Sequence, residues 1–367
     1  MTGDNVLIEG ITFRNFNFTG NGGAISWIGK YGTLKNCNFQ NNNVKLEGGA
    51  IHWNGADGSI SDSTFINNTS NIGAAILWGG ANGKLTGSTF INNTANQYGG
   101  GISWWGANGS IISSTFNGNS ATAHDGGGVL WAGDNGTIID SIFTSNSANY
   151  GAGVCWANSA DNGTLTGSNF NNNTAKGIGG GIYWGGVNGT IIDSIFTSNS
   201  ANYGGGVLWA ADNGILTGSK FSRNTAKTNG GGTIQWNGAN GIVFKSTFTD
   251  NTARQSGGAI YWNVIGSMVN CTFINDKWIN SYSKSNGIYV RLQLIIKGGS
   301  GIVDLVNSGP LTGISIVVLN NETYYYPPNS NINLPNKKEK NTMLKRDKYP
   351  LNQFILLGIY HRFRIFI

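Results

Sequence analysis

Apolar and polar positions alternate over short stretches of this chain, and the alternation returns about every 26 residues. Tryptophan marks the repeat most clearly, at steps that range from 25 residues (Trp53 to Trp78) to 28 residues (Trp156 to Trp184). The repeat tryptophans are Trp27, Trp53, Trp78, Trp104, Trp131, Trp156, Trp184, Trp209, Trp236 and Trp262. The repeat phenylalanines are Phe13, Phe39, Phe65, Phe90, Phe116, Phe143, Phe170, Phe196, Phe221, Phe248 and Phe273. An internal repeat of this length indicates a solenoid or a repeat array.

The pattern inside one unit predicts short β-strands. Ile or Val stands two residues before every repeat tryptophan, as Val129 does before Trp131. Residues two apart lie on one face of a strand, so this face should be core, and the variable residue between them should face solvent. Asn-Gly or Asp-Gly follows in most units and marks a tight turn, because these residues tolerate a positive φ. We expect two or three short strands per unit.

The units must stack on one another to form a core. None shows a helical pattern, and none is long enough to bury a core alone. Parallel strands of successive units then pair about 4.8 Å apart, and like side chains form ladders. The sequence therefore predicts an all-β fold, a single-stranded right-handed parallel β-helix of about 10–11 coils. Its hand follows from the usual hand of parallel crossovers.

A Phe-x-x-Asn phrase runs unbroken from Asn42 to Asn251. We predict that these asparagines form a structural ladder, because an amide both donates and accepts hydrogen bonds. The alternative interpretation of the column is a polar binding strip.

The composition changes along the chain. Residues 1–287 carry the repeat, and residues 288–330 keep a β-like pattern without it. The second segment is expected to form closing coils or a β-rich capping module, because solenoid ends must cover open strand edges. Residues 331–367 are expected to form a basic, poorly ordered tail.

Charge and composition exclude several classes of protein. The net charge of +6 arises in residues 331–367, with eight Lys and Arg against two Asp and Glu, whereas residues 1–330 carry 15 of each sign. The repeat body thus has no electrostatic reason to bind nucleic acid or an anionic membrane. Only 11% of residues are charged and only five are Pro, although 58 are Gly. These values exclude a charge-rich disordered chain and a collagen.

Two phrases connect the chain to known families. Gly-Gly-Ala-Ile and Phe-x-x-Asn resemble the repeats of chlamydial polymorphic membrane proteins. The fuller unit, with Gly-Gly-x-Ile-x-Trp, resembles the adhesin-like surface proteins of methanogenic archaea. The resemblance covers about residues 1–290 and implies a right-handed, pectin-lyase-like β-helix that is secreted or exposed at the cell surface. It implies glycans or surface proteins of another cell or host as partners, although such families share a scaffold rather than a site.

The ends of the chain carry no targeting signal that we recognise. Strand-like residues Asp4–Ile8 follow almost directly on Met1, with no basic-then-apolar signal peptide before them. No uncharged apolar segment of membrane-spanning length follows. The expectation is a fragment, a mis-assigned start or one piece of a split gene. Export is inferred from the resemblance, and no membrane insertion by this chain is expected.

The acidic residues bear on the alternative that the protein is an enzyme, because many β-helix proteins degrade polysaccharides with clustered carboxylates. Asp134 and Asp161 share a turn position in adjacent coils and form the best pair. The remaining turn acids are Asp57 and Asp212, and in a second column Asp62, Asp140 and Asp193. We interpret all of them as Asp that replaces Asn in turns. We predict no catalytic residue and keep a carbohydrate-active enzyme as the alternative.

His and Cys residues give no metal or cofactor site. His52, His124 and His361 share no column and no metal-ligand spacing. Cys37 and Cys271 stand nine coils apart, too far for a disulfide, and are expected to replace Ser in the core. Cys155 lies on the variable face and is expected to be an exposed thiol.

Three tyrosines are the candidate binding residues. Tyr98, Tyr150 and Tyr203 each stand four residues before the Ile or Val of their strand, in alternate coils. One interpretation is an aromatic strip that binds an extended glycan or another partner. The other is that each Tyr shields a corner of the core. We expect an adhesin-like surface protein, and the alternatives are the enzyme and a purely structural spacer.

Overall fold

The computed structural model describes residues 1–228, 232–254 and 257–278, together with the backbone of six strands between Gly287 and Leu334. The chain divides into two compact units, Met1–Asn336 and Lys337–Ile367. The second unit lies outside the described residues, and so does most of the predicted tail.

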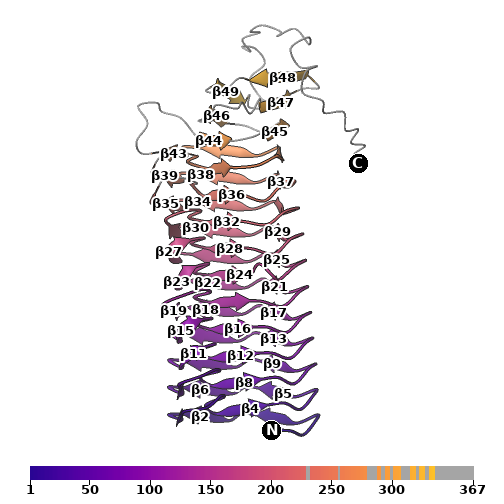
Figure 1. The fold of residues 1–367 in the computed structure, drawn as a ribbon, viewed down its shortest axis with the longest axis vertical. Coiled ribbons are helices and arrows are strands. Elements are labelled where there is room, and N and C mark those ends of the chain that lie inside the picture. The colour runs from indigo at the N-terminus through magenta and orange to yellow at the C-terminus, as the bar shows by residue number, and fades with distance from the viewer. Residues whose placement is uncertain are drawn as a thin grey trace. The chain divides into compact units, whose positions relative to one another are not determined.

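Each coil of the repeat contains four strands, one in each of four sheets, and the chain then returns one step along the stack (Figure 1). Equivalent strands of neighbouring coils pair in parallel and in register, as Val129 with Val154 and Trp131 with Trp156. The prediction of an all-β parallel β-helix is confirmed. The prediction of two or three strands per unit is wrong, because the short polar link after each Phe-x-x-Asn phrase forms a strand of its own.

The four sheets follow one another along each coil in the order A, B, C, D, and the residues described here give them 14, 11, 11 and 13 strands. Sheet A contains β1 (Leu7–Glu9), β5 (Thr33–Lys35), β9 (Ser59–Ser61), β13 (Lys84–Thr86), β17 (Ser110–Ile112), β21 (Thr137–Ile139), β25 (Thr164–Thr166), β29 (Thr190–Ile192), β33 (Ile215–Thr217), β37 (Gly241–Phe244), β41 (Gly266–Val269), β45 (Leu294–Lys297), β47 (Ser315–Leu319) and β48 (Glu322–Tyr326). Sheet B contains β2 (Thr12–Arg14), β6 (Asn38–Gln40), β10 (Thr64–Ile66), β14 (Thr89–Ile91), β18 (Thr115–Asn117), β22 (Ile142–Thr144), β26 (Asn169–Asn171), β30 (Ile195–Thr197), β34 (Lys220–Ser222), β38 (Thr247–Thr249) and β42 (Thr272–Ile274).

Sheets C and D complete each coil. Sheet C contains β3 (Asn17–Phe18), β7 (Asn43–Val44), β11 (Thr69–Ile72), β15 (Thr94–Tyr98), β19 (Ser120–Ala121), β23 (Ser147–Tyr150), β27 (Thr174–Ile178), β31 (Ser200–Ala201), β35 (Thr225–Ala226), β39 (Thr252–Ala253) and β43 (Lys277–Trp278). Sheet D contains β4 (Ile25–Trp27), β8 (Ile51–Trp53), β12 (Ile76–Trp78), β16 (Ile102–Trp104), β20 (Val129–Trp131), β24 (Val154–Trp156), β28 (Ile182–Trp184), β32 (Val207–Trp209), β36 (Ile234–Trp236), β40 (Ile260–Trp262), β44 (Gly287–Val290), β46 (Gly301–Val306) and β49 (Ser330–Leu334).

The pairing changes after β43. Strands β44 and β46 extend sheet D in parallel, as β45 and β47 extend sheet A. The last strand of each sheet, β49 and β48, then pairs antiparallel. The domain boundaries drawn from the sequence at residues 287 and 330 stay predictions.

Aromatic ladders fill the core. The repeat tryptophans of sheet D stack with ring centroids 4.3–5.2 Å apart, and the repeat phenylalanines of sheet B stack at 4.6–5.1 Å. The tryptophans are at most 1% exposed. The inward assignment of the Ile-x-Trp face is therefore confirmed, and stacked rings at this spacing add to the stabilisation that burial gives.

The predicted asparagine ladder is confirmed and lies inside the coil. Each member is fully buried, and its Nδ2 donates to the Oδ1 of the next coil, as Asn146 does to Asn173 at 3.0 Å. The second Nδ2 hydrogen of Asn146 is donated to the Phe116 carbonyl oxygen at 3.0 Å. Its Oδ1 accepts from both the Nδ2 and the backbone N–H of Asn119. Every polar group of the amide is thus satisfied, as burial requires.

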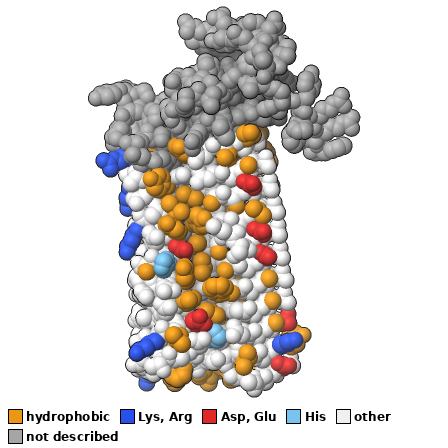
Figure 2. Space-filling view, in the orientation of Figure 1, with side chains coloured by type: hydrophobic (Ala, Val, Ile, Leu, Met, Phe, Trp, Pro, Cys, Tyr) orange, Lys and Arg blue, Asp and Glu red, His pale blue; other side chains and the backbone are white. Residues whose placement is uncertain are grey.

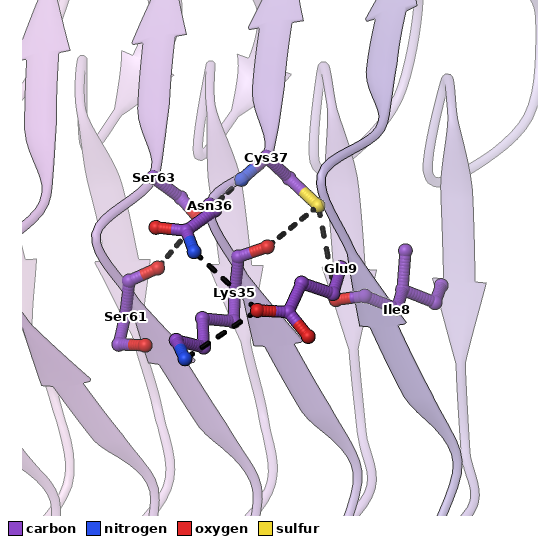
Figure 3. A network of polar contacts seen from close by, with 7 residues as sticks. All are labelled: Ile8, Glu9, Lys35, Asn36, Cys37, Ser61 and Ser63. Carbon is purple, nitrogen blue, oxygen red and sulfur yellow. Dashed lines mark hydrogen bonds and ion pairs between the residues drawn. The ribbon is translucent and has the colours of Figure 1, made fainter.

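A second internal column holds the serines that precede each phenylalanine, and Cys37 and Cys271 occupy its two ends. Figure 3 shows the first of these sites, where the Cys37 backbone N–H donates to the Ser63 Oγ at 3.1 Å. The Cys37 thiol donates to the Lys35 carbonyl oxygen at 3.2 Å, as the serine hydroxyls do elsewhere in the column. Both cysteines are buried and free, as predicted.

Candidate functional site

The three candidate tyrosines lie in one column, at the turn between sheets C and D. Backbone pairing aligns Ile72 with Tyr98, Tyr150 with Ile178, and Ile178 with Tyr203. Asp125 pairs with Tyr150 and fills the coil between Tyr98 and Tyr150. The alternate spacing read from the sequence therefore holds in space, and a binding role for Tyr98, Tyr150 and Tyr203 stays a prediction.

The outer face of sheet D is less exposed than predicted. Leu77, Leu130, Cys155 and Leu208 are only 3–7% exposed, although they point away from the core. The prediction that this variable face meets solvent is wrong for these residues, and so is the prediction that Cys155 is an exposed thiol.

Together these residues form a band that we call the sheet D strip. Its floor is the middle residue of each strand from β12 to β32, and the floor residues are Leu77, Ser103, Leu130, Cys155, Tyr183 and Leu208. Its flank is the turn column, whose residues are Ile72, Tyr98, Asp125, Tyr150, Ile178 and Tyr203, together with His124 and, on the other side, Trp105. Figure 2 shows hydrophobic side chains gathered along this face, within a surface of mainly uncharged polar groups.

Trp105 is the residue of the strip that our sequence reasoning missed. Its side chain is 51% exposed, whereas the repeat tryptophans are buried. The indole Nε1–H donates to the Ser103 Oγ at 2.8 Å, which holds the ring over the buried Ser103. The sequence does contain a sign of it, because Trp105 directly follows the repeat tryptophan Trp104 and must therefore point away from the core.

Tyr150 and Tyr183 form an aromatic pair in the middle of the strip. Their ring centroids are 6.1 Å apart, with the rings tilted by 30°. The Tyr183 hydroxyl donates to the Asn158 Oδ1 at 2.7 Å. Tyr150 is 38% exposed, and Tyr183 is half-buried. Burial is the main cause that raises the pKa of Tyr183, so this hydroxyl stays neutral.

Asp125 places a carboxylate beside these rings. Burial raises the pKa of Asp125, while the neighbouring His124 and a backbone hydrogen bond from Tyr150 act against the shift. Its Oδ1 is buried and has no hydrogen-bond partner among the described residues. On the other side, the His124 ring stacks on Tyr98 with centroids 5.1 Å apart. The strip therefore contains an unused hydrogen-bond acceptor between two aromatic groups.

Cys155 is not an activated nucleophile. Burial raises the pKa of its thiol well above the usual range, and Asp125 adds to the shift. A catalytic cysteine needs the opposite, a thiolate stabilised by positive surroundings.

Polar residues bound the strip in both directions. Toward β8, the His52 Nε2 lies 3.4 Å from the Glu47 Oε2. Burial lowers the pKa of His52, and Glu47 partly offsets this. Toward β36, the Gln235 side chain donates to Asn237 at 3.3 Å. The apolar band thus extends over the coils from β12 to β32.

The Asp residues considered above as possible catalytic carboxylates lie in turns. The Asp134 Oδ1 accepts the Asp161 backbone N–H at 2.9 Å, and the Asp161 Oδ1 accepts that of Val187 at 2.9 Å. Asp212 accepts the Ala239 N–H in the same way. Asp62, Asp140 and Asp193 have positive φ in the A–B turn. The structure thus brings Asp134 and Asp161 together as backbone acceptors.

In the part of the chain that the structure describes, no three His, Cys, Asp or Glu side chains gather into a group that could hold a metal ion. Within the same residues, no helix has the length and apolar character that crossing a membrane requires.

Comparisons with known proteins agree with the surface-protein resemblance over a short stretch. Residues 245–261 match the Chlamydia polymorphic membrane protein repeat. No curated protein matches the chain. Among solved structures, a surface adhesin of Streptococcus pneumoniae, PfbA, is 12% identical, and the alignment covers 85% of this chain and 88% of that one. The TM-score is 0.34.

Proposed function

We propose that the chain is the β-helix of an adhesin-like protein at the cell surface, which attaches to other cells, glycans or matrix through the sheet D strip. The observation that carries this proposal is the continuity of the strip along successive coils. Scattered apolar residues are ordinary on a protein surface, whereas a contiguous patch marks an interaction site. The match to a membrane-protein repeat at residues 245–261 supports a surface location.

The chemistry of the described residues favours attachment over catalysis. A polysaccharide-degrading enzyme needs a carboxylate pair, or carboxylates with a metal ion, free to act on the substrate. Asp134 and Asp161 instead accept backbone N–H groups. The thiol of Cys155 is buried. Nucleic acid is a poor partner for this body, since residues 1–330 carry equal numbers of acidic and basic side chains.

Adhesion of beads coated with the full chain to cells and to matrix glycoproteins tests the proposal. The combined Tyr98→Ala, Tyr150→Ala and Tyr203→Ala variant should adhere far less than the wild type. Each contact along a repeated column is weak, and attachment depends on several at once. The matched control is Ile142→Ala, which removes a side chain 42% exposed on sheet B.

Two outcomes would contradict the proposal. Unchanged adhesion by the triple variant, with an intact circular dichroism spectrum, would leave the tyrosines as corner packing. A wild-type chain that coats the beads but adheres to nothing would favour the structural spacer.

A further inference from the structure

We infer that the sheet D strip binds an uncharged glycan chain that lies along the coil axis between β12 and β32. This inference rests on the proposed function and deepens it by naming the chemical class of the ligand. The other occupants of an apolar strip, a protein surface or an acidic polysaccharide, are outcomes of the test below.

The exposed aromatic rings suit the apolar faces of sugar rings. Trp105 and Tyr150 expose 51% and 38% of their surface, and neighbouring groups hold both in place. Ser103 fixes the indole of Trp105, and Tyr183 packs against Tyr150. Rings that are ordered before binding give contact area at little entropic cost.

The polar groups of the strip are hydrogen-bond acceptors, so they favour a ligand that donates hydroxyl groups. The Asp125 Oδ1 has no hydrogen-bond partner and is covered by neighbouring protein atoms, so a ligand hydroxyl reaches it only when a neighbouring side chain shifts. The Tyr183 hydroxyl already donates to Asn158, so its remaining capacity is also that of an acceptor. A ligand with many hydroxyl groups next to C–H faces meets both needs. The apolar side chains of a protein partner would leave these acceptors unsatisfied.

The charge of the strip disfavours an acidic glycan. Asp125 and His124 are its ionisable residues apart from Tyr and Cys, and burial already disfavours the charged form of Asp125. Lys84 and Lys220 belong to β13 and β34, in sheets A and B. Lys176 belongs to β27, as Ile178 of the flank does, and its Nζ donates to the Thr122 carbonyl oxygen at 3.3 Å. A uronic acid in the strip would therefore meet the Asp125 carboxylate and no Lys or Arg among the strip's own residues.

The repeat of the strip suits a polymer. Tyr98 and Tyr150 stand two coils apart, which places them about 10 Å apart along the axis at the spacing of parallel strands. The band from β12 to β32 spans five coil steps, or about 24 Å. A chain of several sugars can contact Trp105 and the Tyr150–Tyr183 pair together, which a single sugar cannot.

Isothermal titration of the full chain with soluble oligosaccharides tests the inference. The probes are neutral β-1,4-linked glucose and mannose oligomers of two, four and six sugars, and a galacturonate hexamer of matched length. The affinity for a neutral series should rise with length, and the galacturonate hexamer should not bind. Trp105→Ala, Tyr150→Ala and Asp125→Ala should each weaken binding by roughly tenfold. Bound hexamer should protect Trp105 from oxidation by N-bromosuccinimide.

The matched control is Tyr31→Asn. Tyr31 is 54% exposed in a turn between sheets D and A, away from the strip. Its φ of 56° is close to the 58° of Asp57 and the 57° of Asn82, which occupy the same turn position in the next two coils. This variant should bind every probe like the wild type. Equal binding of the neutral hexamer by the wild type and by folded Trp105→Ala would overturn the inference. So would the lack of binding to any neutral series.

The adhesin function and the glycan inference are contradicted by different results. If bead adhesion depends on the strip while the neutral oligosaccharides do not bind, the partner is a protein or an acidic glycan, and the adhesin function stands without this inference.

Discussion

At the residue scale, the two longest amide ladders of the described residues run in opposite directions, and each reaches a carboxylate. The buried ladder donates toward the C-terminal coils, and the last described donation runs from the Asn251 Nδ2 to the Asp276 Oδ1 at 2.7 Å. The exposed ladder of the Asn-Gly turns donates toward the N-terminal coils and reaches Asp57, which accepts from Asn82 at 2.9 Å. A carboxylate accepts without donating, so Asp suits the receiving end of each ladder.

The buried position of Asp276 makes the stability of this region depend on pH. Its Oδ2 has no described partner and takes the place of the amide nitrogen that donates to a Phe carbonyl in the other coils. Burial raises the pKa of Asp276 to about 7, although hydrogen bonds from Asn251 act in the opposite direction and lower this pKa. A proton on Oδ2 restores the missing donor.

Asp276→Asn should therefore stabilise the protein at neutral pH. Below about pH 4 the carboxyl is protonated in both states. Between about pH 4 and about 7 only the folded state keeps the proton, so the free energy of unfolding falls as the pH rises. Thermal unfolding from pH 4 to 9 should show this fall in the wild type and a smaller one in Asp276→Asn.

The converse substitution is the control. Asn224→Asp places the same carboxyl inside the ladder and should destabilise the protein, more so at higher pH. An Asp276→Asn profile that follows the wild type at every pH would contradict the prediction.

At the element scale, packing against a Trp ring, rather than backbone freedom, explains why the Asn-Gly turn requires Gly at its second position. Asn135 carries the positive φ of 56° in its turn, and Gly136 does not. A Cβ on Gly136 would lie only 2.1 Å from the Trp131 Nε1. The Gly of each turn is thus needed because the Trp ring of the preceding strand packs against it.

Neighbouring residues of strand β22 should differ sharply in their contribution to stability. Phe143 is fully buried between Phe116 and Phe170, whereas Ile142 is 42% exposed on the same strand. Phe143→Ala should lower the free energy of unfolding by about 3–5 kcal/mol, as large-to-small core substitutions do. Ile142→Ala should lower it by less than about 1 kcal/mol, as surface substitutions do. Denaturant unfolding measures both, and similar losses would show that the inside and outside faces of β22 are misassigned.

At the scale of the whole molecule, each coil contacts chiefly its neighbours, as in other solenoids. Sheets A and D end in the antiparallel strands β48 and β49, and the unit Met1–Asn336 ends just beyond them. The coils before Lys337 therefore form a unit of their own, which bears on how the chain can be shortened.

A chain that ends at Asn336 should unfold at the same temperature as the full chain. Residues 337–367 share neither the repeat nor the apolar periodicity of the coils. Thermal unfolding of the two chains, followed by circular dichroism, is the measurement. A chain that ends at Asp250, which also lacks strands β39 to β49, is the control and should unfold at a lower temperature because paired strands are removed. A large loss on removal of residues 337–367 alone would show that they support the coils.

The sequence by itself determined the coil, its parallel stacking, the inward face of each Ile-x-Trp strand and the asparagine ladder. These features follow from local periodicity, and each residue contacts its own equivalent one repeat away. The fourth strand escaped prediction because it is only two to five residues long, as in Ser120–Ala121, and shows no apolar alternation.

Only the tertiary structure decided what lies on the outer face of sheet D. The sequence gives the direction of a side chain but not what folds over it, so Cys155 and Leu130 were expected in solvent and are buried. The grouping of residues in the strip was also not predictable from the sequence, because Asp125 lies among Tyr150, Cys155 and Tyr183 of the following coils. The physical reason is that these contacts join turns of neighbouring coils, and their geometry depends on how each side chain leaves its turn rather than on the repeat.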